Sequence, residues 1–445
     1  MKLGIRVISR DVIKPSSPKI HDLNPYKLCL FDQLTPHTYV LLIFFYPRNE
    51  SNSNINQTLT RLKSSLSETL NLYHPFSGRT NDNIFVDRFE EGVPFIETRV
   101  DCTLSKFLKH LEIESLDQFL PCKPFCNEDL RKPLNYVQVN VFACGGIALT
   151  WCLSHKIIDG ATISSFFHAW AAISRGFIDQ APHPNLTQAS TMFPPAESIP
   201  RHYLSLVDNL WFRKGNYVTR LFFFNSHSIS RLKAKIKGIG NTTPSANQAL
   251  CVLLWKYFMI ASREVSSTPK LSVLVQPVNL RPRTNPPMSS TSTGNIFRGA
   301  IAVSDPAETH IELEKLLNIL TEAIAIYDSD YLASLQGHGG FEVISERLKQ
   351  QQQLVSSLDP EILTITSCRG FGFNEVDFGF GKPVWLGVMG KGGQASTNFV
   401  MLHDSRYGND GIEAWVTLDE PKMRVLEHDH EFLTFVSPNH KLSSL

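Results

Sequence analysis

A proline-rich stretch near the middle of the chain divides the sequence into two halves. Between Gln180 and Arg201 the helical and strand periodicity is lost, and five prolines occur: Pro182, Pro184, Pro194, Pro195 and Pro200. Such a stretch is typical of a linker. Strand and helix patterns mix on both sides of it, and 445 residues are too many for one ordinary core. The sequence therefore predicts an α/β protein with two similar domains, at residues 1–180 and 216–445, joined by a crossover linker at residues 181–215.

The charge balance and the cysteines exclude several classes of protein. With 43 Lys and Arg against 42 Asp and Glu, no net field attracts nucleic acid or an anionic membrane. The strongest apolar run, Tyr39 to Tyr46, is too short to span a membrane, and the N-terminus lacks a signal-peptide pattern. Eight thinly spread cysteines favour reduced thiols in a cytoplasmic protein. Cys122 and Cys126 have no second pair at zinc spacing, so we expect no metal.

One segment combines regular structure with a reactive side chain. A strand pattern at residues 136–142 is followed by a Gly-Gly turn and a second strand, in which Ile147, Leu149, Trp151 and Leu153 alternate on one face. His155 continues that parity at the end of the strand. Asp159 and Gly160 then precede a predicted helix that ends before Gly176. The result is a His-x-x-x-Asp-Gly pattern between a strand and a helix.

A second cluster lies about 220 residues further on, at Asp377-Phe378-Gly379-Phe380-Gly381. An Asp-Phe-Gly motif also occurs in protein kinases, but no Val-Ala-Ile-Lys strand, His-Arg-Asp loop or Gly-rich phosphate loop accompanies it here. His428-Asp429-His430 is interpreted as a solvated turn rather than a metal pair. Taken alone, His155 fits a satisfied core histidine; the two clusters together favour a functional site.

With both clusters in this order, the sequence resembles the BAHD acyl-CoA-dependent acyltransferases of plants. The resemblance covers nearly the whole chain, and its best match is the vinorine synthase and salutaridinol acetyltransferase branch. Further matching segments are Ile13-Lys14-Pro15-Ser16-Ser17-Pro18, Leu30-Phe31-Asp32-Gln33, Asn279-Leu280-Arg281, Gly294-Asn295 and Gly411-Ile412-Glu413-Ala414-Trp415. Phe380 departs from the family pattern, which has tryptophan there. Tyr73-His74-Pro75 shifts the family's Tyr-Pro pair by one residue.

The resemblance implies two chloramphenicol-acetyltransferase-like domains with a channel at their interface and His155 at its middle. It implies acyl-CoA as co-substrate, with no permanently bound cofactor and no metal. An ion pair from Asp159 to Arg281 would hold the catalytic turn, and Gly160 would permit a close backbone approach. We place Asp377 with His155 as a catalytic residue, although the family pattern implies a loop-fixing carboxylate. Gly379 and Gly381 would let the backbone approach the cofactor.

An imidazole suits the chemistry that this family performs. An alcohol is too weakly acidic to attack a thioester at neutral pH, and a positioned histidine can take its proton as the C–O bond forms. No Gly-x-Ser-x-Gly elbow is present to suggest a covalent acyl-enzyme. Asp159 also permits a dyad with His155, which we rank below a structural role.

The acceptor is less constrained than the chemistry. The branch favours the hydroxyl of an alkaloid or terpenoid, with acetyl-CoA as donor; an acylsugar with short branched acyl donors is the alternative, and an amine acceptor stays open. A catalytically idle relative that binds a small molecule is the alternative of another class. We expect a monomer whose partners are the acyl-CoA donor and a small-molecule alcohol.

Overall fold

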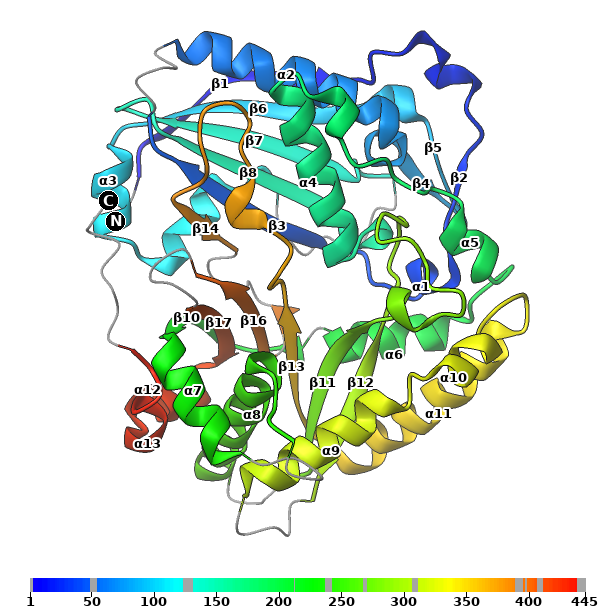
Figure 1. Ribbon diagram of the computed structural model, residues 1–445, viewed down its shortest axis with the longest axis vertical. Helices are drawn as coiled ribbons and strands as arrows, with labels where there is room; N and C mark the ends of the chain where they lie inside the picture. Colours follow the sequence, from blue (N-terminus) through cyan, green and yellow to red (C-terminus); the bar gives the residue numbers. More distant parts are fainter. Residues whose placement is uncertain are drawn as a thin grey trace.

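The computed structural model describes residues 3–48, 54–122, 131–211, 213–236, 242–266, 270–305, 311–388, 395–396, 398–405 and 411–437. Two six-stranded mixed sheets organise these residues. Figure 1 shows one sheet in the upper half of the molecule and the other in the lower half, with helices over each. The chain is thus an α/β protein of two parts, as the mixed strand and helix patterns predict.

The upper sheet belongs mainly to the N-terminal half. Its strands in spatial order are β1 (Ile5–Ile13), β6 (Val93–Val100), β7 (Asn135–Phe142), β8 (Ile147–Ser154), β3 (Tyr39–Tyr46) and β14 (Trp385–Gly387). Two helices, α2 (Ile55–Leu72) and α4 (Gly160–Ser174), pack together over this sheet (Figure 1). Every residue of β8 is buried, so this strand lies in the middle of the packed layers and gives the residue after it a rigid support.

The lower sheet belongs to the C-terminal half. Its strands in spatial order are β10 (Tyr217–Phe224), β17 (Ile412–Asp419), β16 (Asn398–Asp404), β13 (Glu361–Ser367), β11 (Ser272–Asn279) and β12 (Phe297–Ser304). The helices that contribute to its core include α7 (Ser226–Lys235), α8 (Ala246–Val265), α9 (Leu313–Ala325) and α11 (Gly340–Leu358). The long apolar α8 is buried along most of its length, and its Ser245 and Gln248 form a capping box at the start.

Short elements connect and cover the two sheets. The strands are β2 (Tyr26–Lys27), β4 (Arg79–Asn81), β5 (Phe85–Asp87), β9 (Arg213–Lys214) and β15 (Ala395–Ser396). The helices are α1 (Leu30–Gln33), α3 (Leu104–Lys109), α5 (Gln188–Met192), α6 (Arg201–Trp211), α10 (Ser329–Ser334), α12 (Glu420–His428) and α13 (His430–Leu433). The segment proposed as a linker therefore contains two helices. Prolines bound them: α5 ends before Pro194, and α6 follows Pro200 directly.

The two halves share a strand and a core. Trp385–Gly387 (β14) pairs with Ile43–Phe45 of β3, so a strand of the C-terminal half completes the N-terminal sheet. One hydrophobic cluster combines Phe45 and Trp385 with Met401 and Trp415 of the lower sheet. The halves are thus packed tightly against each other rather than merely tethered.

Most elements lie where the sequence patterns predict them. The apolar run at residues 39–46 is β3, the amphipathic stretch at residues 54–73 is α2, and the two strands before His155 are β7 and β8. Gly176 follows α4 with a φ of +82°, the left-handed conformation expected after a helix. Among the described residues, no helix is both long and apolar enough to cross a bilayer. Cys126 lies outside the described residues, and the seven cysteines within them are free thiols.

Candidate active site

His155 lies directly after the buried strand β8, at the start of a 3₁₀ turn formed by His155–Ile157. Its backbone N–H donates to the carbonyl of Thr38 at 2.7 Å, which ties the turn to the segment that leads into β3. Its neighbours Ser154 and Lys156 are buried, whereas the His155 side chain is partly exposed. The strand and the hydrogen bond to Thr38 therefore hold the backbone of His155 rigidly, while its side chain stays accessible.

A residue of the C-terminal half contacts His155. The side-chain oxygen of Asn295 lies 2.9 Å from His155 Nδ1, and its Nδ2 donates to the His155 carbonyl at 2.7 Å. The same Nδ2 and the Asn295 backbone N–H donate to Asp32 Oδ1, at 2.9 and 2.7 Å. Asn295 and Asp32 are both fully buried. The ring of Phe297 lies close to the imidazole, with centroids 5.8 Å apart.

The carboxylate of Asp159 forms the ion pair with Arg281 that the resemblance implies. Arg281 Nη1 lies 2.6 Å from Asp159 Oδ2, and Nη2 lies 3.0 Å from Oδ1, so the pair is bidentate and almost fully buried. The guanidinium also donates to the carbonyls of Ser292 and Gly294. The pair therefore joins the turn after β8 to the segment between β11 and β12 (Figure 1).

Besides its ion pair with Arg281, Asp159 accepts two hydrogen bonds from backbone N–H groups. It caps α4 by accepting from the Thr162 N–H at 3.0 Å, and it accepts from the Ile296 N–H at 3.0 Å. Together with Arg281, these donors supply four N–H groups to its two oxygens, which is the full capacity of a carboxylate. This geometry favours the structural role of Asp159 over the dyad with His155.

Gly160 has no room for a side chain. A Cβ built at this position would lie 2.4 Å from Cε2 of Phe371, a ring of the segment after β13. Helix α4 can therefore begin here only if the first residue is glycine or if Phe371 moves. Gly160 thus allows the close approach that its place in the motif predicts, although the approaching group is Phe371 and not a cofactor.

Lys156 is buried beside His155. Its ammonium donates to the carbonyls of Gln33 and Thr35, at 2.8 and 2.7 Å. Burial lowers the pKa of Lys156 to about 7, and the charges of Asp32 and Asp208 oppose that change. Lys156 therefore ties the turn to the residues that follow α1, as the Thr38 contact does from the other side.

Burial lowers the pKa of His155 below its ordinary value of 6.5. Hydrogen bonds with its own backbone and with Asn295, and the negative charge of Asp159, oppose this effect without cancelling it. The imidazole is consequently uncharged at neutral pH, which is the state in which it can accept a proton.

Asp377 organises a different part of the molecule, the loop of residues 377–381. Its Oδ1 accepts from the backbone N–H groups of Gly379 and Gly381, at 2.7 and 2.9 Å. Both glycines have positive φ, +94° and +95°, which turns these N–H groups inward. A Cβ at Gly379 would lie 2.7 Å from Nη1 of Arg61, which donates to the Gly379 carbonyl. The two glycines shape this loop around its own carboxylate.

This loop and His155 lie at opposite ends of α4. Ser174, the last residue of the helix, donates to the Phe378 carbonyl at 2.8 Å, whereas His155 precedes the first turn. A helix of 15 residues is roughly 22 Å long. The structure therefore brings His155, Asp159, Gly160 and Arg281 together, and it places Asp377, Gly379 and Gly381 apart from them.

Phe380 remains an aromatic plug in place of the family's tryptophan. It is buried, and its ring packs edge-on against Tyr46 with centroids 4.9 Å apart. Tyr46 in turn donates to the carbonyl of Val376, which holds the start of the loop. A surface hollow of about 240 Å³ lies on the other side of Phe380.

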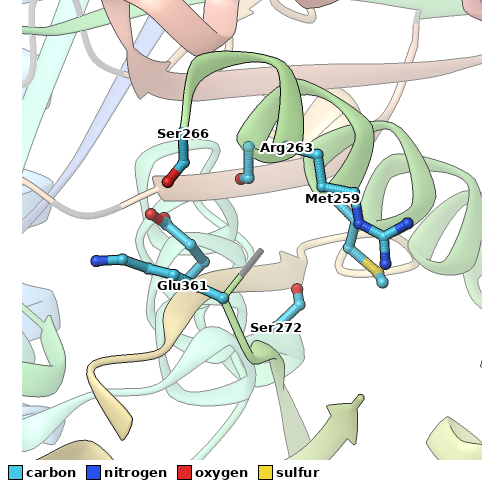
Figure 2. Close-up of a pocket in the computed structure, with 7 residues that line it drawn as sticks. Met259, Arg263, Ser266, Ser272 and Glu361 are labelled. Atoms are coloured by element: carbon cyan, nitrogen blue, oxygen red, sulfur yellow. The ribbon is translucent and has the colours of Figure 1, made fainter. Parts of the chain in front are cut away.

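A second hollow lies far from His155, between the end of α8 and the starts of β11 and β13 (Figure 2). Met259, Arg263, Ser266, Ser272 and Glu361 are among the residues that line it. Its volume of about 10 Å³ is that of a single water molecule. The hollow is therefore too small for an acyl chain or an acceptor.

Two buried residues at the site, Asp32 and Asn295, were not among the predicted site residues. Both occur in segments that carry the family resemblance, Leu30-Phe31-Asp32-Gln33 and Gly294-Asn295. The signal was thus present as a matching segment, but only the three-dimensional contact with His155 assigns a role to it.

Comparisons with known proteins agree with this geometry. A family model described as the Transferase family matches residues 3–433. Akuammiline synthase 2 of Alstonia scholaris is 34% identical over 98% of both chains. A limonoid 7-O-acetyltransferase of Citrus sinensis is 35% identical, covering 97% of this chain and 98% of its own. Vinorine synthase of Rauvolfia serpentina is 33% identical, covering 94% and 95%.

Solved structures share the two-part fold over almost the full length. The crystal structure of vinorine synthase superposes with a TM-score of 0.82 at 30% identity, covering 99% of this chain and all of its own. TRI101 of F. graminearum, crystallised with coenzyme A and T-2 mycotoxin, has the same fold at 15% identity, with a TM-score of 0.70 and coverage of 93% and 99%. By its sequence and by its structure, the chain belongs to the BAHD family of acyl-CoA-dependent acyltransferases.

Proposed function

We propose that this enzyme transfers an acetyl group from acetyl-CoA to a hydroxyl of a bulky specialised metabolite, with His155 as the general base. The observation that carries the proposal is the placement of His155, which is partly exposed and held by contacts from both halves of the chain. Residues 1–180 would supply the base, and residues 216–445 would supply the groups that close the site around it.

The reaction then proceeds in two steps on one imidazole. As the hydroxyl oxygen attacks the thioester carbonyl, His155 accepts the hydroxyl proton, a contribution of about 10²- to 10⁴-fold in rate. The tetrahedral oxyanion collapses, the C–S bond breaks, and coenzyme A leaves as a thiolate that the imidazolium protonates. The products are an ester and free coenzyme A, and no covalent acyl-enzyme is formed.

The lower sheet offers a surface for an apolar acceptor. Phe297, beside His155, begins a face that continues along β12 to Ile301 and across β11 and β13 through Val275 and Thr364. These side chains are partly exposed, although β11 and β13 lie inside the sheet, whereas residues on the opposite face are buried against helices. A partly exposed face in the middle of a sheet borders open space, and its apolar residues suit a ring system.

The relatives narrow the acceptor and the donor. Their names include akuammiline synthase of Alstonia scholaris, stemmadenine O-acetyltransferase of Catharanthus roseus, and limonoid 7-O- and 21-O-acetyltransferases. We therefore propose a hydroxyl of an alkaloid or a terpenoid as acceptor and acetyl as the acyl group. Donor and acceptor would reach His155 from opposite sides of the contact between the halves.

The test is the release of coenzyme A thiol from acetyl-CoA in the presence of alcohol panels. One panel holds indole alkaloid alcohols, a second holds triterpenoid alcohols, and a third holds partially acylated sugars with short branched acyl-CoA donors. Acetyl transfer to a member of the first or second panel supports the proposal. Turnover confined to the sugars would replace the acceptor class, and tight ligand binding without any turnover would show a binding protein.

A further inference from the structure

We infer that Asn295, held by Asp32, determines which nitrogen of His155 carries the proton, so that the C-terminal half completes the base. Asn295 is here a positioning residue: it acts through His155 and not on the substrate. The inference rests on the proposed role of His155 as general base and adds the group that prepares the imidazole for it.

The orientation of the Asn295 amide follows from its two acceptors. Its Nδ2 has two hydrogens, and two oxygens lie within reach: the His155 carbonyl at 2.7 Å and Asp32 Oδ1 at 2.9 Å. If the amide were turned over, its oxygen would face both of these acceptors and both hydrogen bonds would be lost. The amide oxygen must therefore face the ring, 2.9 Å from Nδ1.

The proton position of the ring follows in turn. An amide oxygen only accepts, so Nδ1 must donate to it and carry the hydrogen. A neutral imidazole has one N–H and one lone pair, which places the lone pair on Nε2. Nε2 is thereby the atom that can take the hydroxyl proton. In the other tautomer Nε2 would present an N–H to the hydroxyl and could not act as a base.

Asp32 keeps the amide in place. Besides the two N–H groups of Asn295, it accepts the Cys29 N–H at 2.9 Å, within the capping box of α1. Burial raises the pKa of Asp32, and the donors from Cys29 and Asn295 oppose the rise by stabilising the carboxylate. A Cβ at Gly294 would lie 3.2 Å from Asp32 Oδ2, so the glycine lets this segment approach the carboxylate.

The three groups come from distant parts of the chain. Asn295 is 140 residues from His155 and 263 residues from Asp32, on the far side of the proline-rich stretch. The ring also has a hydrogen bond with the His155 backbone, within the N-terminal half. Asn295 adds its own preference for a protonated Nδ1, and this contribution is present only when the two halves are packed together.

The tautomer itself can be measured. In the wild-type enzyme labelled with ¹⁵N-histidine, we expect the His155 ring to show a protonated Nδ1 and an unprotonated Nε2 at neutral pH, with His155→Ala identifying the signals. In Asn295→Ala we expect a mixture of tautomers and a kcat lowered on the order of a hundredfold, with the KM for acetyl-CoA changed by less than about threefold.

A second variant and a control separate positioning from stability. Asp32→Asn keeps the shape but turns one acceptor into a donor that faces the Cys29 or Asn295 N–H groups. We expect its loss in kcat to overlap with that of Asn295→Ala, so that the double variant loses less than the product of the two. Asn140→Ala removes another fully buried amide, inside β7, and should lower stability without changing the His155 signals.

A wild-type His155 that is protonated on Nε2 would overturn the inference, as would an Asn295→Ala enzyme with wild-type kcat. A wild-type spectrum with a protonated Nε2 overturns the inference even if Asn295→Ala does not fold. These outcomes concern the tautomer and its control by Asn295, and the base assignment has a test of its own in His155→Ala. A His155→Ala enzyme with near-wild-type turnover would instead remove the proposed function, so the two failures are distinguishable.

Discussion

The turn of residues 155–160 and the loop of residues 377–381 are built in a similar way, but they lie in different surroundings. In each, an aspartate accepts backbone N–H groups beside a glycine that no larger residue can replace without strain or displacement. Asp159 is buried, pairs with Arg281 and joins the two halves next to His155. Asp377 accepts hydrogen bonds within its own loop, a helix length away. Two aspartates in similar motifs thus differ in which parts of the chain they hold together.

Removal of the imidazole should produce the largest effect. We expect His155→Ala to lower kcat by about 10²- to 10⁴-fold, because the general base is lost, while the fold is retained. Steady-state thiol release and thermal unfolding measure the two quantities. His110→Ala, at an exposed position on α3's C-terminal end, is the matched control and should behave as wild type. A His155→Ala enzyme within tenfold of wild type would show that the turn carries no base.

Asp159→Ala should mainly destabilise the protein. It leaves the Arg281 guanidinium buried without its partner, at a cost of about 3–5 kcal/mol in the free energy of unfolding, measured by chemical denaturation. Asp159→Asn keeps an acceptor for the Thr162 N–H and should lose less. If Asp159→Ala kept its stability and only slowed catalysis, the carboxylate would act on the imidazole as in a dyad. Its role would then be catalytic and not structural.

Asp377→Ala should cost less than the loss of Asp159. It removes one acceptor from two N–H groups in a partly exposed loop, about 1–3 kcal/mol, and activity should fall only as far as the loop loosens. Hydrogen exchange at Gly379 and Gly381 measures the loosening. Asp377→Asn retains an acceptor oxygen and is the matched control. Should Asp377→Asn lose as much kcat as His155→Ala while remaining stable, Asp377 would belong to the chemistry after all.

The pH dependence separates the two regions because the imidazole of His155 lies in only one of them. Activity requires the neutral ring, so kcat/KM should fall as pH falls through the lowered pKa of His155, with its midpoint below 6.5. Between that pKa and 6.5 the unfolded chain binds a proton that the folded chain does not, so stability should also decrease as pH falls through this window. Rate and urea-unfolding profiles check both. A midpoint at or above 6.5 would contradict the desolvation of the ring.

The smallest effect concerns the aromatic plug of the loop. We expect Phe380→Trp to change the unfolding free energy by less than about 1.5 kcal/mol, because the hollow beside Phe380 offers room for the larger ring. Differential scanning calorimetry measures the change. A larger loss would show that the loop has adapted closely to phenylalanine.

Much of the fold was predictable because its signals are local. The strand β3, the amphipathic α2 and the two strands before His155 each show their period within a few residues. Of the site, the residues that lie in short sequence motifs could be predicted. Asn295 was not predicted as a site residue because its contacts are with Asp32 and His155, which are far from it in the sequence. No local period relates these three residues. The place of Trp385–Gly387 in the upper sheet escaped for the same reason, since three residues carry too little pattern to reveal a partner strand.

The pairing of β14 with β3 has a consequence for how the chain folds during translation. Among the described residues, one edge of Tyr39–Tyr46 pairs with β8 and the other pairs with Trp385–Gly387, which are translated late. Until those residues emerge, a strongly apolar strand presents open peptide groups to any neighbouring chain, a template for aggregation. Truncated products that stop before residue 385 should therefore precipitate, and coexpression of the missing C-terminal piece should rescue their yield.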